Sequence, residues 1–83
     1  MIKYSEKEQE LFKLLRAKPR TTSQIVEAYY KGKKARPYFA DATTCNALHS
    51  LRDKRLYNED RPFIGHEPRR GRTPAMWWKV VRG

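Results

Sequence analysis

Residues 43–57 read TTCNALHSLRDKRLY, and this stretch has the periodicity of one helix with a single buried stripe. The stripe consists of four residues that recur every three or four positions: Thr44, Leu48, Leu51 and Arg55. Three of these four side chains are suited to burial. Asp41, just upstream, is a favourable N-cap residue. The pattern therefore predicts a helix over residues 42–55.

Two shorter helices are predicted upstream. Each starts at a capping box, a hydroxyl residue followed three residues later by Glu or Gln: Ser5 with Glu8, and Thr21 with Gln24. The first helix is expected over residues 6–17, because Pro19 stops it. The second is expected to end near Gly32, and the link through Arg20 and Thr21 is a candidate edge strand.

Loops and strands account for the rest of the chain. Residues 31–40, KGKKARPYFA, contain Gly, Pro and four positive charges, which favour a loop. Residues 58–62 are predicted to form a turn, and PFIGHEP, RRGRTP and AMWWKVV then predict strand, Gly-centred loop and strand. Trp77 and Trp78 are adjacent, so on a strand only one of them lies in the core.

The order of these elements resembles that of winged helix-turn-helix proteins. TTSQIVEAYY resembles their second helix, TTCNALHSLRDKRLY their recognition helix, and GRTPAMWWKVV the returning strand of their wing. The resemblance covers roughly residues 5–82 and implies an α+β fold, a three-helix winged helix-turn-helix with a C-terminal β-hairpin wing. We expect a single domain over residues 1–83. The chain departs from the family in its long basic loop, and in having Arg55 where a glycine commonly ends the recognition helix.

The charge balance points to a polyanionic partner. Nineteen Lys and Arg against nine Asp and Glu give a formal net charge of +10 over 83 residues. Such an excess destabilises a compact state by self-repulsion, and a polyanion is its simplest explanation. A hydrophobic content of 39% favours a folded module over a basic disordered tail.

The third helix carries the candidate reading residues on the face opposite its apolar stripe. They are short polar side chains of the kind that meet base edges in the major groove: Thr43, Asn46, His49 and Ser50. Asn46 is the first choice, because an amide bonds adenine N6 and N7 together. The competing interpretation is an ordinary solvated helix face.

Two basic clusters supply candidate DNA contacts of another kind. The wing, residues 63–81, has three arginines around Gly71 that suit a narrow minor groove or phosphates: Arg69, Arg70 and Arg72. The loop before the third helix has four basic residues suited to backbone contacts: Lys31, Lys33, Lys34 and Arg36. A solvated charged hairpin loop is the alternative for the wing.

Several functions have little support in the sequence. No residues form a recognised catalytic motif, so we expect no enzyme activity and no cofactor. Cys45 is the only cysteine, so no internal disulfide can form, which favours a reducing, intracellular compartment. Cys45 also completes no recognised metal site with His49 and His66. No apolar run reaches the roughly 18 residues of a membrane span. We expect a cytoplasmic protein, associated with the nucleoid if it is bacterial or from a phage.

The leading hypothesis is a sequence-specific transcriptional regulator that binds double-stranded DNA, either alone or as a homodimer. The main alternative is a winged-helix interaction module that binds RNA or an acidic protein. Single-stranded nucleic acid stacking on an exposed Trp is a further alternative. A partial resemblance to the winged helices that bind Z-form nucleic acid rests on Thr73, Pro74, Trp77 and the run at residues 48–51, but His49 lies where that branch usually has Tyr.

Overall fold

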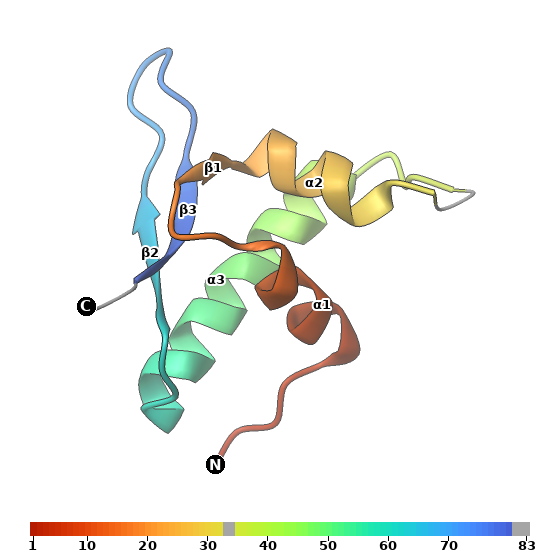
Figure 1. Ribbon diagram of the computed structural model, residues 1–83. Helices are drawn as coiled ribbons and strands as arrows, with labels where there is room; N and C mark the ends of the chain where they lie inside the picture. Colours follow the sequence, from red (N-terminus) through yellow and green to blue (C-terminus); the bar gives the residue numbers. More distant parts are fainter. Residues whose placement is uncertain (33–34, 81–83) are drawn as a thin grey trace.

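Three helices pack beside a small antiparallel sheet in a computed structural model that describes residues 1–32 and 35–80 (Figure 1). In chain order the elements are α1 (Glu6–Leu14), β1 (Arg20–Thr21), α2 (Thr22–Tyr30), α3 (Ala40–Asn58), β2 (Phe63–Glu67) and β3 (Met76–Val80). The strand order is β1-β3-β2, so the two-residue strand between the first two helices pairs with the returning strand of the hairpin. The predicted α+β class is confirmed, and the arrangement is consistent with a winged helix. Lys33, Lys34 and Val81, which belong to the predicted basic loop and wing, lie outside the described residues.

Both predicted capping boxes are present. The Ser5 hydroxyl accepts from the Glu8 amide at 3.1 Å, and the Glu8 carboxylate accepts from the Ser5 amide at 2.7 Å. Thr21 and Gln24 repeat this exchange at 3.1 and 2.9 Å. Each box satisfies two amides that a helix start leaves without partners, which fixes where α1 and α2 begin.

The first two helices end earlier than predicted. α1 stops at Leu14 instead of residue 17, because the chain turns extended at Leu15 and the Arg16 carbonyl accepts from the Lys79 amide of β3 at 2.8 Å. The pairing with β3 therefore holds the chain in an extended conformation directly after α1. α2 stops at Tyr30 instead of near Gly32, with Lys31 in an extended conformation.

The third helix is longer than predicted at both ends. Its N-cap is Phe39 instead of Asp41, and Asp41 lies in the first turn, because Ala40 is 2% exposed and packs as a helical residue. At the other end α3 passes Arg55 and continues to Asn58. Glu59 then takes the left-handed conformation, with φ of 57°, that a C-terminal glycine usually provides. The predicted turn at residues 58–62 correspondingly starts one residue later.

The hairpin is held by a regular antiparallel register that pairs Gly65 with Trp78 and His66 with Trp77. Gly65 is necessary in this register because a Cβ there would lie 2.2 Å from Cε2 of the Trp78 indole. The absence of a side chain thus leaves room for Trp78 to cover the strand.

The core lies between the three helices and the inner face of the sheet. Seven fully or nearly fully buried side chains form one cluster: Leu11, Leu15, Ile25, Leu48, Leu51, Ile64 and Trp77. Trp77 is therefore the inward tryptophan, and Trp78 is only half-buried. The predicted phase of α3 is confirmed, because all four residues of its stripe are buried, Arg55 included.

Candidate nucleic-acid interface

The exposed face of α3 carries three of its four predicted reading residues. Thr43, Asn46 and His49 are exposed, on the side opposite the buried stripe. The Thr43 hydroxyl donates to the backbone of its own helix, with the Phe39 and Ala40 carbonyls at 3.0 and 3.2 Å. For Asn46 no hydrogen bond is found within the described part of the chain. Its amide can therefore offer both a donor and an acceptor to a ligand.

Ser50 lies apart from these three. It is half-buried on α3, and its hydroxyl lies near enough to the Glu8 carboxylate of α1 to help lower the pKa of that group. Lys54 donates to the same carboxylate at 2.7 Å. Burial works to raise the pKa of Glu8, but the hydrogen bonds from Lys54 and Ser5, together with the nearby Ser50 hydroxyl, outweigh it and hold the pKa below its usual value. The Ser50 side chain therefore contributes to the contact between α1 and α3.

The wing arginines are exposed at the tip of the hairpin. Arg70 and Thr73 exchange two backbone hydrogen bonds, at 3.0 and 2.8 Å, which close the turn. Gly71 within it has a φ of +54°, a conformation that glycine adopts without strain. Figure 1 shows this loop extending away from the helices, beyond β1.

A groove of about 430 Å³ joins the wing to the starts of α2 and α3. Arg69 and Arg72 line it from the wing, and Ser23 lines it from α2. Asp41, Ala42 and Cys45 line it from the first turns of α3. The structure thus brings two of the three wing arginines next to the helix that carries the candidate reading residues.

His49 connects the exposed face of α3 to the sheet. Its ring lies 4.8 Å from that of His66 and 4.9 Å from that of Trp77, measured between centroids. The His66 ring stacks on Trp77 at 3.9 Å. Burial lowers the pKa of His66, and the nearby positive charges of His49 and Arg52 lower it further.

The loop before α3 is basic but partly neutralised. Arg36 lies 3.1 Å from the Asp41 carboxylate and 3.8 Å from that of Glu27, whereas Lys31 is exposed. Backbone contacts by this loop remain a prediction.

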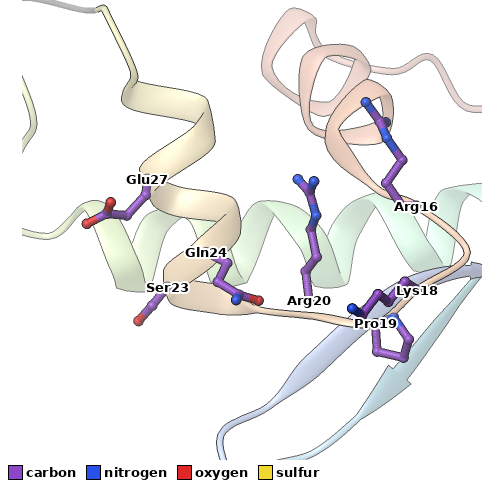
Figure 2. Close-up of a pocket in the computed structure, with 7 residues that line it drawn as sticks. All are labelled: Arg16, Lys18, Pro19, Arg20, Ser23, Gln24 and Glu27. Carbon is purple, nitrogen blue, oxygen red and sulfur yellow. The ribbon is translucent and has the colours of Figure 1, made fainter.

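A second groove, of about 670 Å³, lies beside the outer face of α2 and was not found by sequence reasoning (Figure 2). Its basic residues come from the linker after α1 and from β1: Arg16, Lys18 and Arg20. Figure 2 shows Arg16 and Arg20 reaching in the same direction from separate segments. Arg16 donates to the Lys13 and Leu15 carbonyls and Arg20 to the Leu14 carbonyl, which fixes both guanidinium groups at the end of α1. The sequence signal was the run RAKPR at residues 16–20.

We also searched the described residues for a metal site, a reactive thiol and a membrane span. Among these residues no group of three His, Cys, Asp or Glu side chains is placed to hold a metal ion. Cys45 is half-buried, and this burial raises the pKa of its thiol, which disfavours a reactive thiolate. None of the helices described is both long enough and apolar enough to cross a membrane.

Comparison of the chain with known protein families, with curated proteins and with solved structures finds no match.

Proposed function

We propose that the protein binds double-stranded DNA inside the cell as a sequence-specific transcriptional regulator. The N-terminal half of α3 enters the major groove, and the wing contacts the flanking groove or backbone. The observation that carries the proposal is the groove in which Arg69 and Arg72 meet the first turns of α3. A single duplex can therefore be contacted by reading residues and wing arginines together.

The charge distribution supports this proposal. The formal net charge is +10, and the wing tip carries three exposed arginines within four residues. Binding to phosphates would relieve the self-repulsion of these groups and release counterions from the DNA.

Binding titrations over a salt series test the proposal. With about five to seven phosphate contacts, the slope of log affinity against log salt is expected to be roughly −5 to −6 for duplex DNA. Random duplex, single-stranded DNA and structured RNA are compared at each salt concentration. A slope near zero, or preferential binding of single strands or RNA, would contradict duplex DNA as the target.

The groove beside α2 favours a second candidate function, the binding of an acidic protein segment. It presents three basic residues, and α2 lines it with Ser23, Gln24 and Glu27, on the side away from the buried Ile25 and Val26. A peptide offers carboxylates to the basic residues and backbone N–H groups to Glu27, whereas a phosphodiester backbone offers no such donors. Replacing Lys18 and Arg20 by Gln tests this candidate, because it should abolish capture of an acidic peptide and leave binding to DNA nearly unchanged.

A further inference from the structure

Two neighbouring aromatic side chains are left in solvent at the start of α3. Tyr38 is 94% exposed and Phe39 is 67% exposed. Their rings meet edge to face, with centroids 4.9 Å apart, so they form one apolar surface. Exposed aromatic groups that contribute nothing to the core commonly mark a site of interaction.

Phe39 is fixed to the exposed face of α3. Its carbonyl accepts from the Thr43 amide at 2.9 Å and from the Thr43 hydroxyl at 3.0 Å. Phe39 precedes Thr43 by four residues and Asn46 by seven, so the three lie along one side of the helix. The aromatic pair therefore extends the candidate reading face by one turn at its N-terminal end.

Helix stability does not explain a phenylalanine at this position. Phe39 is the N-cap of α3 and makes no side-chain cap hydrogen bond. Ser, Thr, Asp or Asn at an N-cap would stabilise the helix, and Phe forgoes that contribution. The one acidic side chain in the first turn, Asp41, is paired with Arg36, which reduces its repulsion of a polyanion.

We propose that Tyr38 and Phe39 contact thymine 5-methyl groups in the major groove. This inference rests on the proposed binding of duplex DNA. The thymine methyl is the apolar group among the base edges of the major groove, and an aromatic side chain is suited to bury it. Asn46 would then hydrogen-bond the polar edge of one base, and the aromatic pair would contact the methyl groups of thymines along the same face of α3.

Replacement of thymine by uracil tests the inference, because it removes this methyl and keeps the base pair. A duplex selected for binding from a random pool is prepared with thymine and with uracil throughout. The parent protein is expected to bind the uracil duplex about fourfold more weakly for each methyl contacted. Phe39→Ala and Tyr38→Ala should each reduce this ratio, and the double variant should bring it close to one.

Tyr57→Ala is the matched control. Tyr57 is 71% exposed and lies at the opposite end of α3, so its variant should keep the full thymine preference. A ratio unchanged in the Tyr38→Ala, Phe39→Ala double variant would overturn the inference, as would a parent protein that binds both duplexes equally. Tighter binding to single-stranded DNA would also overturn it, in favour of stacking on unpaired bases. Failure to bind any duplex would instead refute the proposed function.

Discussion

The guanidinium carbon of Arg55 lies 3.8 Å from the centroid of the Phe12 ring, within the contact between α3 and α1. The same side chain is only 8% exposed, and its Nε donates to the Pro62 carbonyl at 2.8 Å. Arg55 therefore ties α3 both to α1 and to the turn that leads into β2. Arg55 therefore has a structural role inside α3, whereas the left-handed residue that ends this helix is Glu59.

Replacing Arg55 by Met should destabilise the fold by about 1 to 3 kcal/mol. The variant keeps an apolar stem, but it loses a charge-assisted hydrogen bond and the cation–π contact, while relieving the cost of a buried charge. Urea denaturation measures the free energy of unfolding. Arg52→Met is the control, because Arg52 is exposed on the same helix and its loss should change stability by less than about 0.5 kcal/mol. Equal stabilities of the two variants would contradict the role assigned to Arg55.

The sequence predicted those features of the fold that depend on neighbouring residues. The capping boxes at Ser5 and Thr21 are each complete within four residues, and the buried stripe of α3 follows from helical periodicity alone. Asn46 and His49 were placed on the exposed face by the same periodicity.

Features that depend on residues distant in the chain could not be predicted. α1 ends early because Arg16 pairs with Lys79, 63 positions away, and Asp41 is not the N-cap because Ala40 is buried in the folded domain. The turn of Ser50 toward Glu8 likewise depends on how α1 packs on α3. The groove beside α2 forms only when the linker is held against that helix.

Leu48→Ala and Leu51→Ala should each destabilise the domain by about 2 to 5 kcal/mol. Both side chains belong to the core cluster, at 0% and 1% exposure, and their truncation leaves a cavity. Leu56→Ala provides the control on the same helix, because Leu56 is 62% exposed. Thermal melts of the three variants check the prediction, and a core variant that melts with the Leu56 variant would show that the phase of α3 is wrong.

Stability should fall as the pH drops below about 6.5, because the folded protein holds the pKa of His66 below that ordinary value. In the window between the ordinary and the lowered pKa, the unfolded chain binds a proton that the folded one does not, so acid favours unfolding. Glu8 acts at lower pH, since its pKa lies below 4.5. Unfolding free energies at pH 7.5 and 5.5 measure the effect, which His66→Gln should largely remove. An equally steep pH dependence in His66→Gln would assign the effect to another group.

Replacing Arg70 and Arg72 together by Ala should weaken binding to preferred and random duplexes alike. If both guanidinium groups neutralise phosphates, the magnitude of the salt slope falls by about 2, because two counterions fewer are released. Titrations of both duplexes over a salt series measure this change. If the arginines instead enter a narrow minor groove, the loss will be selective for A·T-rich flanks. That result would revise the role of the wing and leave α3 as the reading element.

Asn46→Ala should reduce specificity and not general affinity. Asn46 is exposed two turns after Phe39, with an amide able to donate to one atom of a base and accept from another. Loss of such a paired contact should cost about 1 to 3 kcal/mol on the preferred duplex and much less on random DNA. The salt slope should stay nearly constant, because the substitution removes no positive charge. Asp53→Ala is the control, because it also truncates a side chain on the exposed face of α3. Since this variant loses a negative charge, any change in its binding should be a gain on both duplexes. Equal losses from Asn46→Ala on preferred and random duplexes would refute α3 as the reading element.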